Sequence, residues 1–487
     1  MKPLSALRLC GDCFVWIFST TETQNTQRFH RAQPAFVENP NLYYDSFQQI
    51  PHTIMNFDQT LKYLLSLGHE TLSMKLGLRN TELLLEALAN PERTFLSVQI
   101  AGTNGKGSTA VMLDSICRKA RRATGLYTSP HLVSITERIK VNGCAISEEQ
   151  FAGQATTVRS VAERLVAEEK LEALPTFFEQ VTAIALLAFR EADVKVAILE
   201  TGLGGRLDST TAAKSQVVAI TQIAMDHEEY LGTTLESIAA EKAAIIHPDV
   251  RIVVVADHQP SEALAVIKRR CEEQNVRAAI GECAVRIDEV AEDGRFRASF
   301  KTPTDVYDRL RLGLAGEHQL DNAAVAIQLA EALEIDHTAI TEGIETTRHP
   351  GRLEWVPATP PILLDGAHNV AAMKSLSAHL RRFGRRPLTV IFGAMRDKRA
   401  DEMIAILREI SDNLILTKAA NIRSADPEDL LSRNAATPVR TMRIAPTSGD
   451  ALREAISSTP PDGLIVVTGS LYLVGEIRNQ LVRDLDQ

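Results

Sequence analysis

Cysteine is scarce in this sequence, and so are long apolar runs. Six cysteines in 487 residues do not make a disulfide framework, so we expect a reducing, cytoplasmic setting. Cys10 and Cys13 have the spacing of a redox or metal pair, but no second pair of ligands lies nearby in the sequence, and we attribute the spacing to chance. The longest apolar run, residues 181–189, is much shorter than the roughly 20 residues of a membrane span. It predicts a core helix.

The sequence also lacks an excess of basic residues. Its net charge of -9 argues against nucleic acid as the main partner, because binding a phosphate backbone requires a basic surface. A local basic pocket for a small anion remains compatible with this charge. The hydrophobic fraction of 45% and the charged fraction of 24% are typical of a soluble globular protein. A chain of 487 residues exceeds one ordinary core and predicts two domains, or three.

Residues 1–54 lack both sustained periodicity and the long apolar core of a signal peptide. They are rich in Gln, Asn, Thr and Phe, and a periodic segment begins only near Met55. We expect either a disordered extension or a start assigned too early, with Met55 as the true initiator.

Strand-like and helical patterns alternate from Phe95 to about Thr221. The β-branched runs at 194–200 and 217–221 suit buried parallel strands, and Ser147 to Gln150 form a capping box at the start of a helix. This alternation predicts a doubly wound α/β domain. After the Pro350-Gly351 pair comes a second α/β series, with apolar runs at 362–365, 388–393, 414–417 and 464–469. We therefore predict two domains, 55–347 and 348–487.

A glycine-rich segment lies between the apolar run that ends at Ala101 and the helical pattern from Thr109 to Ala120. Such a turn gathers backbone N–H groups and the positive end of a helix dipole, which together favour phosphate. Lys106 adds a positive charge for the outer phosphates, and the Ser108 hydroxyl suits a magnesium ion. The alternative is an ordinary Gly/Ser/Asn-rich turn. We predict a nucleotide-binding loop of Gly102, Thr103, Asn104, Gly105, Lys106, Gly107 and Ser108.

Two further predicted strands end in polar residues that could lie near the nucleotide-binding loop. Glu200 ends one apolar run and is followed by a glycine-rich turn, and a carboxylate at the carboxyl end of a parallel strand is a candidate ligand for Mg²⁺. The alternative is a solvated glutamate on a tight turn. Asp226 and His227 follow the next run in the same way, although a lone histidine is more often structural.

Lys242 lies in line with apolar residues of a predicted helix. Thr233 and Glu236 fit a capping box, and Leu235, Ile238, Lys242 and Ile245 then share one stripe. Burial would lower the pKa of this lysine and leave a neutral amine that can react with CO₂. The alternative is a lysine whose stem packs while its ammonium reaches water.

Ten motifs of the sequence, read in order, resemble those of folylpolyglutamate synthases and dihydrofolate synthases, which belong to the Mur ligase superfamily of ATP-dependent amide ligases. They are GTNGKGS, YTSPHL, ERIKVNG, PTFFEQVTA, LETGLGGRLDST, DHEEYLG, EKAAII, GEHQLDNA, PGRLE and LDGAHN. The match extends from about Met55 to the C-terminus. The family usually has LDATN where this sequence has Leu207 to Thr211, and often GLDH where it has Ala224 to His227.

The resemblance implies an α/β fold: a P-loop ATPase domain with a parallel sheet, and a smaller, C-terminal Rossmann-like domain. It implies transfer of the ATP γ-phosphate to a carboxylate of a pterin substrate, followed by attack of the L-glutamate amine on the acyl phosphate. The expected partners are these small molecules, and neither nucleic acid nor a membrane is expected. The protein is expected to be a monomer.

The resemblance also assigns roles to individual residues. Lys106 is expected on the outer phosphates, Ser129 and Glu200 on one Mg²⁺, His227 on a second, and Lys242 as a carbamate. The implied nucleotide contacts are Asn322, Arg352 and Asp365. The implied pterin pocket consists of Thr176, Phe177, Phe178, Glu179, Leu207, Asp208 and Ser209. Two other functions remain open at this point: a Mur-type ligase for a cell-wall precursor, and a nucleotide-binding regulator without ligase activity.

Overall fold

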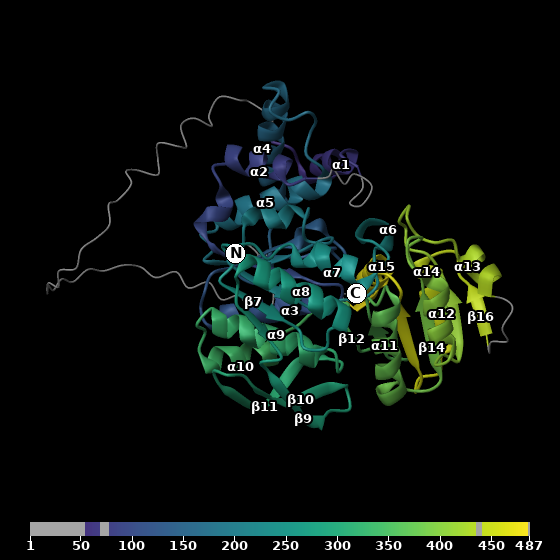
Figure 1. Cartoon of the computed structure of the whole chain (residues 1–487). Helices are drawn as coiled ribbons and strands as arrows, with labels where there is room; N and C mark the ends of the chain where they lie inside the picture. Colours follow the sequence, from purple (N-terminus) through teal and green to yellow (C-terminus); the bar gives the residue numbers. More distant parts are fainter. Residues whose placement is uncertain (1–53, 69–76, 435–440, 486–487) are drawn as a thin grey trace, which may run out of the picture. The chain divides into compact units, whose positions relative to one another are not determined.

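The computed structural model describes residues 54–68, 77–434 and 441–485 (Figure 1). All but the last residue of the predicted extension 1–54, and with it Cys10 and Cys13, lies outside these residues. The chain from His52 onward forms one compact unit. Within the described residues, no helix is both long enough and apolar enough to cross a bilayer.

The first sheet has the strand order β4-β3-β2-β5-β1-β6-β7-β8. Its strands are β1 (Leu96–Ala101), β2 (Thr124–Tyr127), β3 (Ile139–Val141), β4 (Cys144–Ala145), β5 (Val196–Glu200), β6 (Val217–Ile220), β7 (Ile252–Val255) and β8 (Ala278–Ile280). The strands from β2 to β8 in this order are parallel, and β3 and β4 are antiparallel. Strand β1 pairs with β5 on one side and β6 on the other, so the carboxyl ends of these three strands meet at one edge.

The helices of this part are α1 (Phe57–Ser66), α2 (Arg79–Ala87), α3 (Lys106–Lys119), α4 (Glu148–Ala167), α5 (Phe177–Glu191), α6 (Glu228–Leu231), α7 (Leu235–Ala243), α8 (Ser261–Gln274), α9 (Gln319–Ala332) and α10 (His337–Thr346), with 3-10 turns η3 (Pro91–Thr94), η4 (Ile135–Arg138) and η5 (Ser209–Ala213). Helices α3 and α9 pack on one face of the sheet, and α5, α7 and α8 pack on the other. The predicted core helix at 181–189 is α5, and Ser147 caps α4 as predicted. Helix α3 is buried from Ser108 to Cys117, because α9 and α10 pack against it.

A three-stranded antiparallel sheet of β9 (Ala284–Val290), β10 (Arg295–Lys301) and β11 (Val306–Ala315) was not predicted. Its inner face buries Phe296, Phe300 and Leu312 in the same core as α3, α9 and α10. The sequence gives little sign of it, because β9 is largely exposed and carries alternating polar residues.

The C-terminal sheet has the order β12-β13-β17-β14-β15-β16. It consists of β12 (Glu354–Val356), β13 (Ile362–Leu364), β14 (Leu388–Phe392), β15 (Asn413–Leu416), β16 (Thr441–Ile444) and β17 (Leu464–Thr468), with helices α11 (Val370–Phe383), α12 (Ala400–Arg408), α13 (Pro427–Asn434), α14 (Ser448–Ser458) and α15 (Leu471–Leu485).

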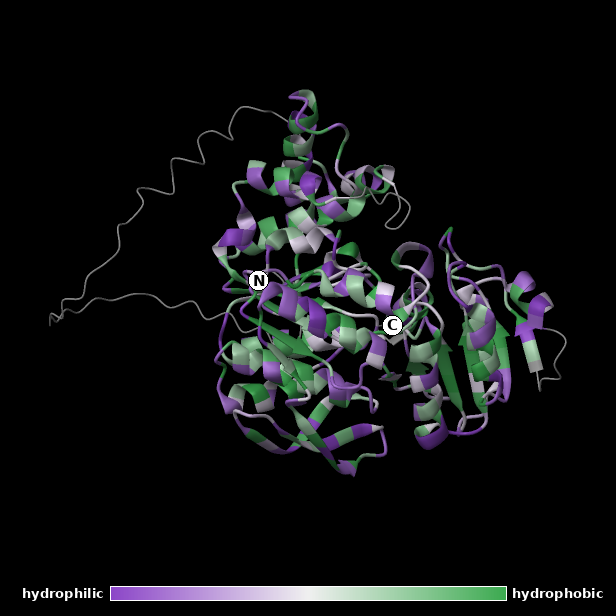
Figure 2. Cartoon of the chain, in the orientation of Figure 1, coloured by the Kyte–Doolittle hydropathy of each residue, from purple (hydrophilic) through white to green (hydrophobic). Residues whose placement is uncertain are grey.

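In this C-terminal sheet, all neighbouring strands are parallel except β12, the edge strand, which runs antiparallel to β13. Figure 2 shows its central strands as apolar almost throughout, which matches burial on both faces. The α/β fold with a second, smaller parallel-sheet region is therefore confirmed. The division predicted at residue 348 falls between α10 and β12, and it stays a prediction.

Candidate active site

The loop after β1 has the backbone of an anion cradle. Gly102 and Gly105 have φ values of +148° and +90°, which L side chains rarely adopt, and α3 begins directly afterwards at Lys106. A Cβ atom on Gly102 would lie 1.9 Å from the Oγ1 atom of Thr221. Both glycines are thus required by the turn, and the first turn of α3 presents its free N–H groups at this point.

Lys106 folds back over the loop. Its Nζ atom donates to the carbonyl oxygens of Gly102 at 3.0 Å and Thr103 at 3.1 Å. Burial lowers the pKa of Lys106, while the neighbouring carboxylates of Glu200 and Asp226 oppose that shift. The ammonium is therefore held over the loop, where an incoming phosphate would meet it.

Glu200 and Ser129 meet at the carboxyl ends of two adjacent strands. Glu200 ends β5, and its Oε2 atom accepts a hydrogen bond from the backbone N–H of Ser129, just beyond β2, at 3.1 Å. Burial raises the pKa of Glu200, and Lys106 counteracts it. The structure thus brings together two of the residues that we assigned to a metal.

His227 occupies a left-handed position (φ +51°) at the start of α6. Its Nδ1 atom is buried without a hydrogen-bond partner among the described residues, and its Nε2 atom lies 3.4 Å from Nζ of Lys398. Burial, followed by the charge of Lys398, lowers the pKa of His227 to about 3. The imidazole is therefore neutral and has one nitrogen available for a ligand.

Lys242 points into the site and not to solvent. It is 4% exposed, and its Nζ atom donates to the Gly102 carbonyl at 2.8 Å. Burial and the charge of Lys106 lower its pKa to about 7. The helix differs in detail from our prediction: Thr234 caps α7 with Ser237 as its partner, instead of Thr233 with Glu236, and α7 ends before Ile245.

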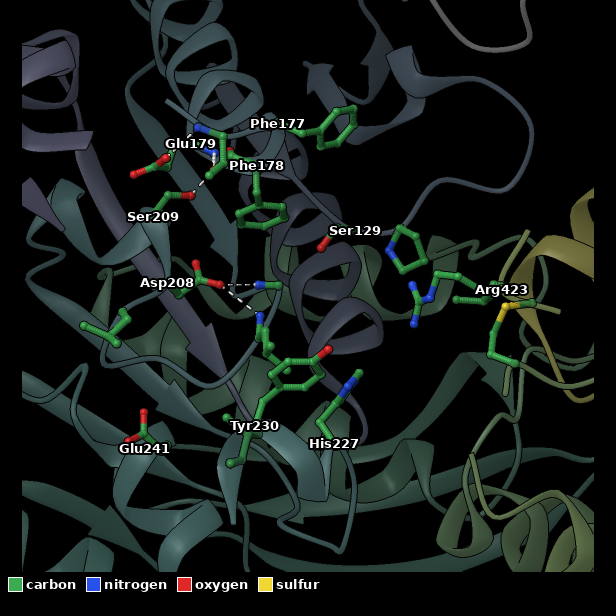
Figure 3. A pocket seen from close by; sticks show the side chains of 18 of the residues that line it. Ser129, Phe177, Phe178, Glu179, Asp208, Ser209, His227, Tyr230, Glu241 and Arg423 are labelled. Carbon is green, nitrogen blue, oxygen red and sulfur yellow. Dashed lines mark hydrogen bonds between the residues drawn. The ribbon is translucent and has the colours of Figure 1, made fainter. Parts of the chain in front are cut away.

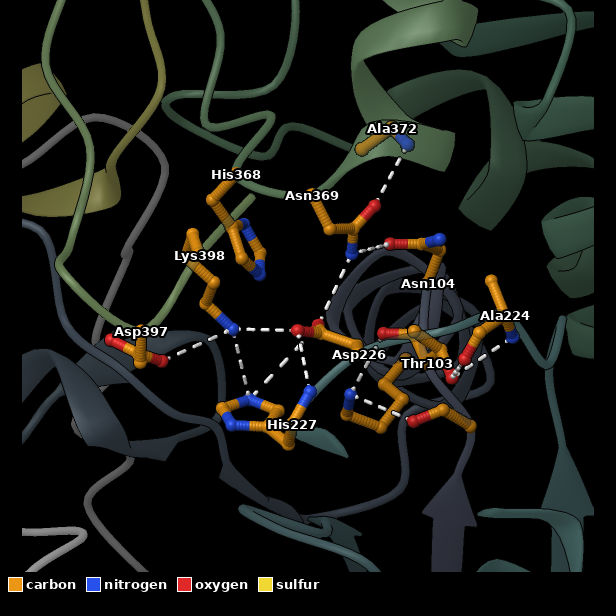
Figure 4. Close-up of polar contacts among 12 residues, drawn as sticks. Thr103, Asn104, Ala224, Asp226, His227, His368, Asn369, Ala372, Asp397 and Lys398 are labelled. Atoms are coloured by element: carbon orange, nitrogen blue, oxygen red, sulfur yellow. Dashed lines mark hydrogen bonds and ion pairs between the residues drawn. The ribbon is translucent and has the colours of Figure 1, made fainter. Parts of the chain in front are cut away.

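The C-terminal part contacts the loop through a buried polar cluster (Figure 4). Lys398, beyond β14, forms an ion pair with Asp226 at 2.6 Å, and both side chains are 7% exposed. The Nδ2 atom of Asn369 donates to Oδ1 of Asn104 at 3.0 Å and to Oδ2 of Asp226 at 3.2 Å. Burial alone would raise the pKa of Asp226, but Lys398 and His227 outweigh it and lower that pKa.

Of the three further residues assigned to the nucleotide, Asn322 belongs to α9, whereas Arg352 and Asp365 belong to the linker and the C-terminal part. Asn322 lies against the loop, since a Cβ on Gly105 would be 2.1 Å from its Oδ1 atom. Asp365 is tied to the backbone, accepting from the N–H groups of Leu353 and Ala367 at 3.0 Å each. Arg352 donates to the Gly366 carbonyl at 3.3 Å. Asp365 thus shapes the turn that holds Arg352, and its own nucleotide contact stays a prediction.

All seven residues assigned to the pterin pocket line one cavity (Figure 3). Phe177 and Phe178 supply apolar walls, and Phe178 packs so closely on Gly202 that a Cβ there would lie 2.3 Å from its ring. Ser129 and His227 line the same cavity. Its C-terminal lining, which our sequence analysis did not predict, includes His368, Met395, Lys398, Arg423 and Tyr472.

Two carboxylates of this cavity are held by backbone N–H groups of nearby residues. Glu179 accepts from the N–H of Thr176 at 2.7 Å in the capping box of α5. Asp208 accepts from the N–H groups of Gly202 and Leu203 at 2.8 and 2.9 Å. Rigid walls of this kind position a ligand precisely because they do not rearrange when it binds.

Comparison with known proteins identifies the family. Residues 100–330 match the Mur ligase middle domain, and residues 351–471 match the Mur ligase glutamate ligase domain. The dihydrofolate synthase/folylpolyglutamate synthase of Bacillus subtilis is 34% identical over 423 residues, which cover 85% of this chain and 97% of that protein.

Two solved structures have the same fold. Folylpolyglutamate synthase of Mycobacterium tuberculosis, complexed with ADP, has a TM-score of 0.81 at 30% identity, covering 87% of this chain and 98% of that one. Escherichia coli FolC in complex with DHPP and ADP has a TM-score of 0.79 at 27% identity, with 89% and 100% covered. The chain therefore belongs to the dihydrofolate synthase/folylpolyglutamate synthase family of Mur ligases, and it is an ATP-dependent ligase of folate metabolism.

Proposed function

We propose that this protein joins L-glutamate to dihydropteroate, to reduced folates, or to both. The observation that carries the proposal is the cavity: all seven residues assigned to the pterin line it, together with Ser129 and His227 from the phosphate side. An acceptor seated there would present its carboxylate toward the loop of Gly102 to Ser108. The family favours this acceptor class over a cell-wall precursor and over a regulator without activity.

In the proposed reaction, a carboxylate oxygen of the acceptor attacks the γ-phosphorus of ATP and ADP leaves. The glutamate amine then attacks the acyl carbon, its nitrogen gives up one proton, and inorganic phosphate departs with the C–O bond electrons. Lys106 and the loop amides hold the phosphates, and Asn322, Arg352 and Asp365 provide further contacts to the nucleotide. Because phosphoryl transfer requires little covalent catalysis by the protein, these residues act mainly by positioning the substrates and neutralising charge.

The residues at the sheet edge suit Mg²⁺. Glu200 offers a buried carboxylate that accepts from the backbone N–H of Ser129, and His227 offers a buried nitrogen without a partner in the described structure. No group of three or more His, Cys, Asp or Glu side chains that could hold a metal occurs in the described ranges. A cation held by few side chains, with phosphate and water completing its shell, matches magnesium. Bound there, it would neutralise developing phosphate charge, with Ser129 and Glu200 on one ion and His227 on a second.

Lys242 suits a carbamate. The ammonium first loses one proton, and the neutral amine then attacks CO₂, forming an N–C bond and losing a second proton, so a cation is replaced by an anion. The buried amine has a pKa of about 7, so a neutral fraction is available at neutral pH, and Lys106 and Lys398 are near enough to favour the anion. The carbamate would then serve as an anionic ligand within the site. We propose that the protein acts in this form as a monomer.

The proposal is tested by measuring ADP release by the purified chain in the presence of glutamate and Mg²⁺, with dihydropteroate and with tetrahydrofolate in parallel. Turnover with both acceptors would establish a bifunctional synthase, and turnover with one would assign the chain to that branch. Release of ADP with neither acceptor, under conditions in which a related synthase is active, would contradict the proposal.

A further inference from the structure

The side chain of His349 packs on the phosphate loop, although it belongs to the segment that leads out of α10. A Cβ atom on Gly107 would lie 3.2 Å from the Cε1 atom of His349 and 3.4 Å from both carboxylate oxygens of Glu200. The imidazole and the carboxylate therefore both lie close to the position that a side chain at residue 107 would occupy. The φ of Gly107 is not in the left-handed region, so the constraint on this glycine comes from tight packing and not from its backbone conformation.

A chain of hydrogen bonds leads from Asn322 to the loop. The Nδ2 atom of Asn322 donates to Oε1 of Gln319 at 2.9 Å, which fixes the orientation of the Gln319 amide. The amide nitrogen of Gln319 then faces Oγ of Ser108 at 3.3 Å and Nε2 of His318 at 3.2 Å. Both of its hydrogens are thereby used, and the Ser108 hydroxyl acts as an acceptor toward Gln319.

The hydroxyl of Ser108 has a single hydrogen, and Nδ1 of His349 lies 3.4 Å from its oxygen. The described residues offer this hydroxyl no other acceptor, so it donates to Nδ1. Burial, with the charges of Arg352 and Lys140, lowers the pKa of His349 well below its usual range, so the ring is neutral. A neutral ring that accepts at Nδ1 has its proton on Nε2. His349 thus carries a fixed N–H donor on the edge away from Ser108.

We propose that the Nε2–H group of His349 donates a hydrogen bond to the terminal phosphoryl group of bound ATP. The inference rests on the proposed function, which seats the triphosphate on this loop. Glu200, whose carboxylate oxygens lie close to the same Cβ position of Gly107, is the carboxylate assigned to Mg²⁺, and an ion held there would neutralise phosphate charge. Arg352, three residues further along the same segment, is one of the residues assigned to the nucleotide.

The proposal predicts that His349 distinguishes ATP from ADP. A donor that meets only the terminal phosphoryl group has no partner when ADP is bound, so it favours the substrate over the product nucleotide. Removing it should therefore weaken the binding of a triphosphate and leave the binding of a diphosphate as it is.

The test is calorimetric titration of the full chain, in Mg²⁺, with ADP and with the methylene-bridged ATP analogue AMPPCP. For His349→Ala we expect AMPPCP to bind about tenfold more weakly, as for loss of a hydrogen bond to a charged group, with ADP affinity within about twofold of the original. His349→Gln, which retains an N–H donor at similar reach, should recover most of the AMPPCP affinity. The exposed His258, changed to Ala, is the matched control and should alter neither affinity.

Unchanged ADP binding also shows that the variant is folded. Equal loss of ADP and AMPPCP affinity in His349→Ala would overturn the proposal, because His349 would then only support the loop. Unchanged binding of both nucleotides would overturn it as well. An unaltered protein that binds neither nucleotide would instead contradict the proposed function.

Discussion

Two lysines donate hydrogen bonds to the same carbonyl oxygen in this site. Nζ of Lys106 lies 3.0 Å and Nζ of Lys242 lies 2.8 Å from the same oxygen, that of Gly102. Two buried ammonium groups at such range repel each other, and burial already disfavours each charge. The lysine on α7 is therefore the one that gains from losing its charge or from becoming an anion.

We expect Lys242→Ala to bind ATP but to lose about a hundredfold or more in turnover, comparable to loss of one preorganised electrostatic group. Added short carboxylates should restore part of it by standing in for the carbamate. The measurement is kcat with and without acetate or formate, and Lys268→Ala on the exposed side of α8 is the matched control. Unchanged turnover in the Lys242 variant would remove the carbamate from the mechanism.

A second residue prediction concerns His379 on α11, whose two ring nitrogens are buried without partners in the described structure. Burial lowers its pKa to about 4. Between pH 6.5 and about 4 the unfolded chain binds a proton that the folded state refuses, so stability falls as pH falls through that window.

His379→Leu should therefore be more stable than the unaltered chain at pH 5, by at most about 2 kcal/mol, with the difference shrinking toward pH 8. The check is the melting temperature of both proteins across this pH range. A difference that does not change with pH would mean that packing, and not titration, accounts for it.

Residues that are marked by local pattern could be predicted from the sequence, and residues placed by tertiary contact could not. The loop, Glu200 and Lys242 follow from strand ends and helix spacing. Lys398 and His349 follow a strand and a helix without a motif that would single them out. Only the approach of the C-terminal part to Asp226, and of the linker to Gly107, shows what they contact.

At the scale of elements, the start of α5 lines part of the cavity that we propose for the acceptor. Thr176 caps α5, and Glu179 completes the box while lining the cavity. Ser147 caps α4 by the same arrangement, with Gln150 as its partner. The two boxes are chemically alike, and only the first lies at the site.

Thr176→Ala and Ser147→Ala should each cost about 1 kcal/mol of stability, because each removes an N-cap. Only Thr176→Ala should also raise KM for the acceptor, since the cap holds the cavity wall. Chemical denaturation and acceptor titrations of both variants provide the comparison. An equal KM for the two variants would show that the wall does not depend on its cap.

Strands that are continuous apolar runs were predicted from the sequence, whereas a strand that is stabilised mainly by pairing with its neighbour was not. The strands that became β5, β6, β14 and β17 are continuous apolar runs, whereas β9 is half polar and is held only by its partner β10. The cap of α7 lies one residue later than predicted: Thr233 with Glu236 fits the capping-box pattern in sequence, but the structure uses Thr234 with Ser237. The hydrogen-bond geometry of the turn decides between them.

At the scale of the whole described chain, two ion pairs join the N-terminal and C-terminal parts. Lys398 and Asp226 are buried, each 7% exposed, whereas Arg399 and Glu228 are 49% and 27% exposed. A buried pair leaves an uncompensated charge when one member is removed, at a cost of about 3–5 kcal/mol, while an exposed pair contributes about 1 kcal/mol or less.

Lys398→Met should therefore lower kcat about a hundredfold or more, and Arg399→Met less than about tenfold. Small-angle scattering with bound nucleotide should show a more open molecule for the first variant only. Similar losses in both variants, without a change in scattering, would mean that the buried pair does not hold the parts together.

The edge strand β12 directly follows the linker that carries His349 and Arg352, and it contains Trp355, partly buried against the C-terminal core. The sequence has only one other tryptophan, Trp16. With Trp16 replaced by Phe, the emission of the protein would come from a single indole three residues from Arg352, a predicted nucleotide contact. The fluorescence of Trp355 could therefore be used to follow movement of the linker in real time without an added dye.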